Sequence, residues 1–307
     1  MPYELRLQLL RDTVQRAGRQ AVEYRNSAAP NARPITVNTY RPAHAHANSP
    51  IVLVQHGVMR NGDDYRDFWI PAADEHGLVI IAPTFSDEHW PDVMSYNNGN
   101  LLATTDRAAL ADTAAVTAPE TWSYTVIIRL VDDLKASGLL AGQPLYLFGH
   151  SAGGQFVHRL MSVLMPDVFT QIAVGNPGWY TLPLLELPFP EGLGRTPANA
   201  DSLARLFASP LTILAGDQDT QTQDPHLPSE PAALRQGPHR HARALHYYAT
   251  AQAEAARRGL PFHWQLHSIA GIGHDGQAMS AVCAHWWFHH RMPASDQLTA
   301  LAGQHSA

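Results

Sequence analysis

The feature that most constrains the fold of this chain is a glycine-flanked serine between an apolar run and a helix-like segment. Residues 145–148 read Leu-Tyr-Leu-Phe, residues 149–153 read Gly-His-Ser-Ala-Gly, and a helical pattern follows over 155–165. In this strand–turn–helix context, G-x-S-x-G holds its serine on a sharp, strained turn with the hydroxyl above a sheet. The two glycines leave room for the strand and the helix to meet closely. Ser151 is therefore the candidate nucleophile.

Short apolar runs alternate with helical patterns along the chain, which predicts a mainly parallel sheet. Strands are expected at 34–40, 51–55, 78–82, 145–148, 171–174, 211–215 and 263–267. Helices are expected at 63–76, 124–136, 155–165 and 241–258, and three of them stop at a glycine. Continuous Val, Ile and Leu runs are typical of strands buried on both faces. The predicted fold class is α/β, a mostly parallel central sheet flanked by helices.

Length and composition favour one large core. With 307 residues and 45% hydrophobic content, we expect a single domain over 1–307. Apolar residues at helical spacing over 2–25 predict an N-terminal helical extension covering 1–30. Two long irregular stretches, 84–119 and 176–240, are interpreted as lid-like insertions, the second as the lid or cap. The alternative is that they are surface excursions without a role.

Charge and apolar patterning exclude several classes of partner. The net charge is −6 and the basic residues are scattered, so a nucleic-acid partner is not expected. No apolar stretch is long enough for a membrane span, and the N-terminus lacks the pattern of a signal peptide. We expect a soluble protein, cytoplasmic as the sequence stands, or periplasmic or secreted if a signal peptide was removed. The single cysteine, Cys283, is expected to be a buried, inert thiol, and the oligomeric state stays open.

A serine hydroxyl is a weak nucleophile at neutral pH, so it needs a base, and the base needs an acid that fixes its tautomer. The run 211–215 leads into a turn that carries two carboxylates, Asp217 and Asp219. We favour Asp219 as the acid because in the usual G-x-x-D turn the carboxylate stands three residues after the glycine, here Gly216. Asp217 is the alternative, and otherwise forms the turn by bonding its own backbone.

His274 is the candidate base among 18 histidines. It follows two glycines after the last predicted strand and precedes a helix that starts near Gly276. Most of the other histidines are better explained as solvated surface residues, among them His44, His46, His239, His241, His289 and His290. The order of the three residues is serine, acid, histidine, each after a strand, which is the order that this G-x-S-x-G architecture requires.

Acyl transfer also needs donors for the oxyanion of the tetrahedral intermediate. One is the backbone N–H of Ala152, next to the nucleophile. The second is expected in the loop after the strand at 51–55, from the N–H of Val58, with Met59 as the alternative. His56 in this loop is interpreted as structural, holding the loop by hydrogen bonds.

Four motifs together carry a family resemblance. Residues 56–65 read His-Gly-Val-Met-Arg-Asn-Gly-Asp-Asp-Tyr, 149–154 read Gly-His-Ser-Ala-Gly-Gly, 216–219 read Gly-Asp-Gln-Asp and 273–275 read Gly-His-Asp. With them the chain resembles the α/β-hydrolase superfamily and, more closely, the poly(3-hydroxybutyrate) depolymerase-like esterases of LpqC type.

The resemblance implies an α/β-hydrolase fold and a cofactor-independent carboxylic ester hydrolase. It assigns the triad to Ser151, His274 and Asp219, with no metal, and a small-molecule or oligomeric ester as substrate. The sequence departs from secreted polymer-degrading members because no signal peptide, disulfide pair or appended polymer-binding domain is visible. This departure favours a short ester or soluble oligomer over a solid polymer.

Aromatic residues after the strand at 171–174 are the candidate substrate contacts. Trp179 and Tyr180 should lie at the carboxyl edge of the sheet, where open α/β sheets bind ligands. The alternative is ordinary packing. Trp90 and Tyr96 are weaker candidates, and the aromatic residues at 286–288 are assigned to the core.

Two histidine groups are candidate metal ligands. They are His44 with His46, and His285 with His289 at helical i, i+4 spacing. Neither has a carboxylate or a cysteine at a convincing spacing, so no metal site is expected.

Two further functions compete with ester hydrolysis. A peptidase or amidase would use the same triad and the same oxyanion donors, so the sequence cannot separate it from an esterase. A non-catalytic binding protein that keeps the scaffold is the other alternative, and loss of the serine, histidine or acid would indicate it. None of the three is missing.

Overall fold

The chain is built around one eight-stranded sheet, seen in the computed structural model, which describes residues 2–25, 32–103 and 114–303. The strand order is β1-β2-β4-β3-β5-β6-β7-β8. The first two strands pair antiparallel with each other, β2 is antiparallel to β4, and every later pairing is parallel. The predicted α/β fold with a mostly parallel sheet is confirmed.

The elements have the following bounds. The strands are β1 (Gly18–Arg25), β2 (Pro34–Arg41), β3 (Ile51–Gln55), β4 (Val79–Thr84), β5 (Leu145–His150), β6 (Gln171–Gly175), β7 (Leu211–Gly216) and β8 (Gln265–Ile269). The helices are α1 (Tyr3–Gln15), α2 (Gly62–Phe68), α3 (Ile70–His76), α4 (Ser123–Ala136), α5 (Ala152–Leu164), α6 (Ala200–Phe207), α7 (Pro231–Gln236), α8 (Arg240–Arg258), α9 (Gly276–His289) and α10 (Ser295–Gly303), with a short 3₁₀ turn η1 (Pro119–Thr121).

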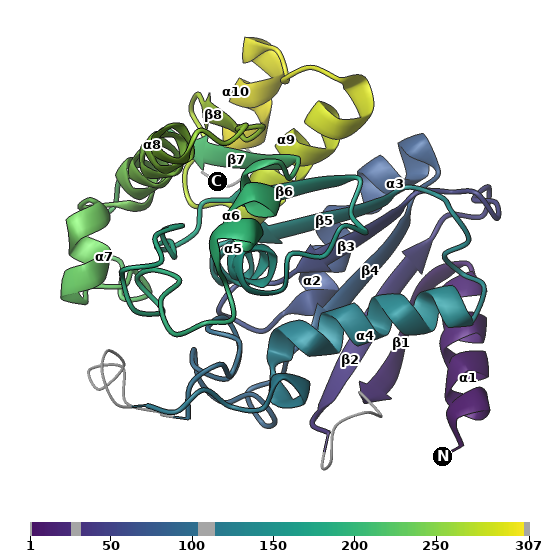
Figure 1. Ribbon diagram of the computed structural model, residues 1–307. Helices are drawn as coiled ribbons and strands as arrows, with labels where there is room; N and C mark the ends of the chain where they lie inside the picture. Colours follow the sequence, from purple (N-terminus) through teal and green to yellow (C-terminus); the bar gives the residue numbers. More distant parts are fainter. Residues whose placement is uncertain (1, 26–31, 104–113, 304–307) are drawn as a thin grey trace.

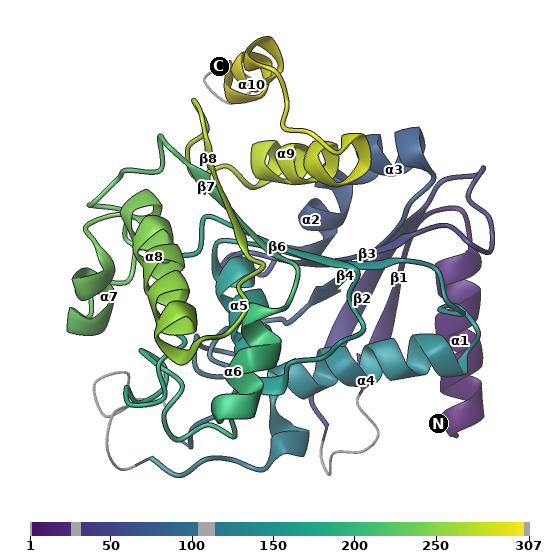
Figure 2. The same ribbon diagram turned by 45° about the horizontal axis from the view of Figure 1, so that its top comes forward.

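Helices cover both faces of the sheet (Figure 1). Helices α1, α4, α5, α6 and α8 lie on one face, and α2, α3 and α9 lie on the other, as the turned view in Figure 2 shows. Each face has its own apolar core, one with Phe156 and Leu130 and the other with Trp69 and Trp287. Because β3, β5 and β7 are buried along nearly their whole length, their sequences are mostly apolar rather than alternating, apart from Gln55, His150 and Thr212.

The N-terminal helical extension predicted for 1–30 is wrong beyond residue 15. Helix α1 ends at Gln15, and β1 begins at Gly18, whose φ of 78° turns the chain. Along β1 the side chains alternate between exposed and more covered positions, as in a half-buried edge strand. Residues 18–25 therefore form a strand, because pairing with β2 along the full length of β1 determines their structure more strongly than the helical spacing of the apolar residues. Residues 1 and 26–30 of this prediction lie outside the described residues.

Two other predicted segments are divided in the structure. The helix expected over 63–76 is two helices, α2 and α3, because a proline in the first turn of α3 cannot extend the preceding helix. The lid or cap excursion expected over 176–240 contains α6 and β7, and the latter is a fully buried strand of the central sheet. It is therefore two separate segments, 176–199 and 217–230. Of the other irregular stretch, 84–119, residues 104–113 are outside the described part.

Among the described residues, no helix combines the length and apolar character needed to cross a lipid bilayer.

Candidate active site

Ser151 lies on a strained turn between β5 and α5. Its φ is 56° and its ψ is −119°, a conformation that non-glycine residues rarely adopt. A Cβ on Gly149 would lie 2.2 Å from the carbonyl oxygen of Gly153, and one on Gly153 would lie 2.1 Å from that of Gln55. Only glycine fits at these two positions, so the strand, the turn and the helix pack closely enough to lift the serine hydroxyl above the sheet.

Ser151, His274 and Asp219 form one continuous hydrogen-bonded chain. The Nε2 atom of His274 is 3.0 Å from Ser151 Oγ, and its Nδ1 is 2.7 Å from Asp219 Oδ2. The three residues follow β5, β8 and β7 respectively. Parallel strands bring these loops to the same edge of the sheet, which is why residues far apart in the sequence meet here.

Asp219 is buried, with 1% exposure, and a buried carboxylate requires compensation. Its second oxygen, Oδ1, lies 3.5 Å from Nη1 of Arg240, which is also 1% exposed. The same guanidinium places Nη2 2.6 Å from Asp224 Oδ2. Sequence reasoning missed Arg240 and Asp224, because neither stands at a motif position.

A second residue missed from the sequence joins the acid loop to the histidine loop. Asn176 accepts a hydrogen bond from Gly216 N and donates one to Gly273 O, each 2.8 Å long. Asp217, the alternative acid, points away from His274 and accepts a 2.8 Å hydrogen bond from Gly271 N. Asn176 and Asp217 therefore fix the spacing between the two loops that carry Asp219 and His274.

The two residues predicted to carry the oxyanion donors, Val58 and Ala152, both border the cavity at Ser151. Neither N–H is engaged by another described residue. His56 holds the Val58 loop, with Nδ1 donating to Gly57 O (2.8 Å) and Nε2 accepting from Phe85 N (3.0 Å). Burial lowers the pKa of His56 to about 3, so the ring is neutral and keeps this bonding pattern.

His150 lies beside the candidate base. Its ring centroid is 4.8 Å from that of His274, and its Nδ1 is 2.8 Å from the hydroxyl of Tyr65. Burial keeps the pKa of His150 well below its ordinary value, and the neighbouring His274 and Arg240 act in the same direction. The neutral ring of His150 thus packs against the ring of His274.

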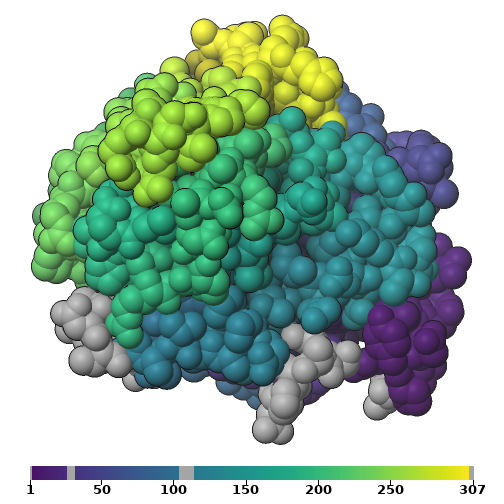
Figure 3. Space-filling view, viewed as in Figure 1, coloured from purple at the N-terminus to yellow at the C-terminus, as the bar shows by residue number. Residues whose placement is uncertain are grey.

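The serine opens into a cavity of about 740 Å³. Its walls come from segments after β3, β4 and β6 and from the residues around α7, and they include Val58, Trp179, Phe189 and Leu227. Figure 3 shows the segment after β4 (blue) bordering the segment after β6 (green) on one face of the molecule. Apolar and proline side chains make up more than half of the lining residues, and the polar ones include the amides of Asn97, Asn98 and Gln155 together with Glu191, His226, Ser229, Glu230 and Arg235.

The two residues predicted to contact the substrate, Trp179 and Tyr180, differ in their position relative to the cavity. Trp179 lines the cavity. Tyr180 does not, since its ring stacks on Tyr247 at 4.3 Å, contacts His158, and is fully buried. Our prediction that Tyr180 contacts the substrate disagrees with this position, because its ring packs against His158 of α5 and Tyr247 of α8 instead of bordering the cavity. Trp90 and Tyr96 are also buried away from the cavity.

The comparisons with known proteins agree with this architecture. The chain is similar to a solved LpqC, a poly(3-hydroxybutyrate) depolymerase from Bordetella parapertussis, at 53% identity over 96% of this chain and 98% of that chain, with a TM-score of 0.89. The chain belongs to the LpqC-type, poly(3-hydroxybutyrate) depolymerase-like family of α/β-hydrolases. The predicted resemblance to the LpqC-type esterases is confirmed, and so is the predicted class of enzyme, an ester hydrolase.

Two further similarities are more distant. A solved poly(aspartic acid) hydrolase-1 from Sphingomonas sp. KT-1 is 32% identical over 88% of this chain and 98% of that chain, with a TM-score of 0.79. A curated bifunctional acetylxylan esterase/xylanase, XynS20E of Neocallimastix patriciarum, is 22% identical over 156 residues, which are 50% of this chain and 20% of that protein. This chain thus matches about a fifth of the curated relative's length. No family model matches the sequence.

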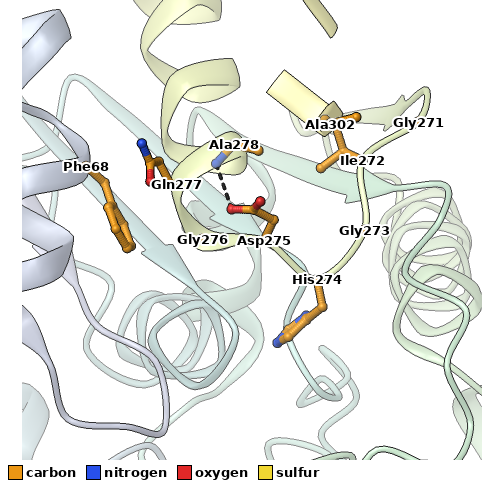
Figure 4. A pocket seen from close by; sticks show the side chains of 10 residues that line it. All are labelled: Phe68, Gly271, Ile272, Gly273, His274, Asp275, Gly276, Gln277, Ala278 and Ala302. Atoms are coloured by element: carbon orange, nitrogen blue, oxygen red, sulfur yellow. Dashed lines mark hydrogen bonds between the residues drawn. The ribbon is translucent and has the colours of Figure 1, made fainter. Parts of the chain in front are cut away.

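This LpqC-type hydrolase has a second hollow, of about 610 Å³, on the other side of the His274 loop. Phe68, the segment 271–278 and Ala302 line it (Figure 4). His274 and Asp275 point in different directions there, and Asp275 Oδ1 accepts a 2.9 Å hydrogen bond from Ala278 N at the start of α9. Ser151 does not border this hollow.

The histidine pair on α9 has neighbours that its spacing alone could not reveal. His289 Nε2 lies 3.3 Å from Glu75 Oε1, and the His76 ring is 4.9 Å from that of His289. Ligand atoms of Glu75, His76 and His289 all lie within 4.8 Å of one another. Glu75 is exposed, and the three side chains form a polar cluster between α3 and α9.

Proposed function

We propose that this LpqC-type protein cleaves carboxylic esters with Ser151 as nucleophile, His274 as general base and Asp219 as the acid that orients the base. The observation that carries the proposal is the unbroken path from Asp219 Oδ2 through both ring nitrogens of His274 to Ser151 Oγ, over 2.7 and 3.0 Å. His274 Nδ1 donates to the carboxylate, which leaves Nε2 as the acceptor for the serine proton.

The reaction would follow in two halves. Ser151 Oγ attacks the ester carbonyl while its proton moves to His274 Nε2, and Asp219 stabilises the resulting imidazolium. The histidine then gives the proton to the leaving alcohol, and an acyl-enzyme remains on Ser151. Water, activated by the same nitrogen, attacks the acyl-enzyme and releases the acid.

The backbone N–H groups of Val58 and Ala152 are proposed as the oxyanion donors. Both border the cavity at Ser151, and such donors typically contribute about 3 kcal/mol each to stabilisation of the transition state. The donors are already in place before a substrate arrives, because His56 and the strained serine turn fix the two loops that carry them.

The substrate proposed is a short or oligomeric ester, with 3-hydroxybutyrate oligomers as the leading class. A cavity of about 740 Å³ accommodates several monomer units, and Trp179 offers an apolar wall for an acyl or alcohol chain. The name of the 53% identical relative, a poly(3-hydroxybutyrate) depolymerase, points to the same chemistry. We infer one domain over 1–307, in which segments 176–199 and 217–230 act as the substrate walls.

Amide hydrolysis is the second candidate. The 32% identical relative is named for hydrolysis of poly(aspartic acid), whose units are joined by amide bonds, and the proposed triad is compatible with either substrate. A panel of matched p-nitrophenyl esters, p-nitroanilides and 3-hydroxybutyrate oligomers, assayed with wild type and His274→Ala, separates the two. Turnover of the 3-hydroxybutyrate oligomers without turnover of the anilides, lost in the variant, supports the proposal, since an activated p-nitrophenyl ester is cleaved faster than its anilide even by an amidase. Anilide turnover equal to or above ester turnover would replace it with an amidase.

A further inference from the structure

Gln155 stands one helical turn after the proposed nucleophile. It is four residues beyond Ser151, so its side chain emerges from α5 on the same face as the serine. Only 5% of the residue is exposed, and it lines the cavity together with Ser151 and Trp179. A buried polar side chain in this position is expected to have all of its hydrogen-bonding groups satisfied, within the protein or by a ligand.

The orientation of the Gln155 amide is fixed by its neighbours. Its Oε1 accepts hydrogen bonds from Arg159 Nη1 and from Asn97 Nδ2, both 3.1 Å long. A guanidinium has donors only, so the group that faces it must be the amide oxygen and not the amide nitrogen.

Arg159 cannot turn away to allow the opposite orientation. The residue is fully buried, and its Nε donates to Thr181 Oγ1 at 2.9 Å. Its Nη1 also donates to Asn98 Oδ1 at 2.6 Å. These bonds hold the guanidinium in place on two sides, and the amide oxygen of Gln155 with it.

The amide nitrogen of Gln155 is therefore forced toward the cavity. It packs against Gly178, where an added Cβ would approach Nε2 to 2.7 Å, next to the cavity residues Trp179 and Pro228. Within residues 2–25, 32–103 and 114–303, no hydrogen bond from this nitrogen is found. Gln155 Oε1 thus accepts two hydrogen bonds, whereas Nε2 has a hydrogen-bond partner available only from a ligand in the cavity.

We propose that Gln155 Nε2 is a specificity-determining donor for a second oxygen acceptor of the substrate, a few bonds from the scissile carbonyl. The site then selects esters that carry a carbonyl or ether-type oxygen near the 3-position over alkyl esters of the same shape. Without that acceptor, the donor stays unsatisfied in the complex, and this lowers transition-state binding. The inference rests on the proposed ester hydrolysis at Ser151.

The test uses two esters of matched shape and the variant Gln155→Glu. p-Nitrophenyl 3-acetoxybutyrate carries the acceptor, and p-nitrophenyl 3,5-dimethylhexanoate replaces its oxygens by carbon. In Gln155→Glu the carboxylate still accepts from Arg159 and Asn97 but has no donor for the substrate. We expect the ratio of kcat/KM values, acetoxy over dimethyl, to fall about tenfold from wild type to variant, the size of one lost hydrogen bond.

Gln236→Glu is the matched control. Gln236 is a buried glutamine whose two amide ends both bond to the backbone of Tyr180, at 2.9 and 2.7 Å, and it does not line the cavity. It should lose stability while the substrate ratio keeps its wild-type value. A purely structural role of Gln155 predicts the same behaviour for Gln155→Glu.

The outcomes distinguish the two proposals. If wild type hydrolyses neither ester, the proposed function fails. If both esters are hydrolysed and Gln155→Glu leaves their ratio unchanged, the role of Gln155 is overturned while the esterase proposal stands. Should Gln155→Glu not fold, Gln155→Met takes its place, and the same fall in the ratio is expected because methionine has no donor either.

Discussion

Asp219 Oδ1 lies 3.5 Å from Nη1 of Arg240, and both residues are 1% exposed. The carboxylate that holds His274 is thus itself held by a buried cation, and the other side of that cation binds Asp224 at 2.6 Å. Asp224 directly precedes the residues 225–232 that line the cavity. Arg240 therefore connects the proposed catalytic acid to the substrate wall.

Replacing Arg240 by Met should destabilise the protein strongly. The change leaves a buried carboxylate without its counter-charge, which typically costs about 3–5 kcal/mol. Urea unfolding measures the loss, and Arg235→Met is the control, because Arg235 pairs with Glu191 while 60% of its own side chain is exposed. An exposed pair should contribute no more than about 1 kcal/mol. Equal losses in the two variants would contradict the role given to Arg240.

The two carboxylates of the β7 turn should differ greatly in kinetics. Asp219→Asn should lower kcat by about 10⁴, since the amide no longer fixes the tautomer of His274. Asp217→Asn should keep most activity and lower only stability, because Asp217 Oδ1 accepts from the backbone of Gly271 and does not contact His274. Steady-state kinetics with one ester substrate tests both, and the reverse ranking would assign the acid to Asp217.

All three residues of the proposed triad could be predicted from sequence because each member stands in a local motif. Gly149 and Gly153 identify Ser151 by a steric requirement, and the same turn logic favours Asp219 over Asp217. Arg240, Asn176 and Gln155 could not be found in this way. Their roles arise from contacts between segments that are distant in the chain, such as the 2.8 Å bonds from Asn176 to Gly216 and Gly273.

The fold was predictable wherever burial imposes a continuous pattern, as in β3, β5 and β7. It was not predictable where tertiary pairing prevails over local spacing. Residues 18–25 resemble a continuation of α1, and only the antiparallel partner β2 makes them a strand. Tyr180 shows the same limit, since nothing local reveals that its ring turns toward Tyr247 while Trp179 faces the cavity.

The free energy of unfolding should decrease when the pH drops below the ordinary pKa of histidine, because the folded protein buries neutral histidine rings. His158 Nδ1 donates to Gly154 O and its Nε2 accepts from Thr181 N, both at 2.9 Å. Burial, with nearby Arg159, keeps the pKa of His158 well below its ordinary value, and burial lowers that of His56 to about 3. Below about pH 6.5 the unfolded chain binds protons that the folded chain does not, so stability is present above that pH and lost as the pH falls.

Each such ring should contribute a slope of about 1.4 kcal/mol per pH unit below about pH 6.5. Urea unfolding at pH values of about 5, 6 and 7 measures the sum, and His158→Gln should reduce the slope by one ring's share. An unfolding free energy that is independent of pH over this range would show that these rings take up protons in the folded protein.

Truncation of Trp179 tests the apolar wall. Trp179→Ala should raise KM and shift the preference among acyl chain lengths, with activity on the smallest esters retained because the proposed triad is untouched. A chain-length series together with a thermal melt on one sample makes the comparison. A destabilised enzyme with the wild-type substrate profile would return Trp179 to a packing role and leave the wall to Phe189 and Leu227.

Covalent labelling of Ser151 tests the central claim most directly. A serine-directed phosphonate is added to wild type and to Ser151→Ala, and intact mass, peptide mapping and ester turnover are followed together. We predict one adduct per wild-type chain, located on Ser151, with activity lost in proportion to labelling, and no adduct or turnover in the variant. A variant that keeps more than about a tenth of wild-type kcat, or an adduct on another residue that abolishes activity, would contradict the account.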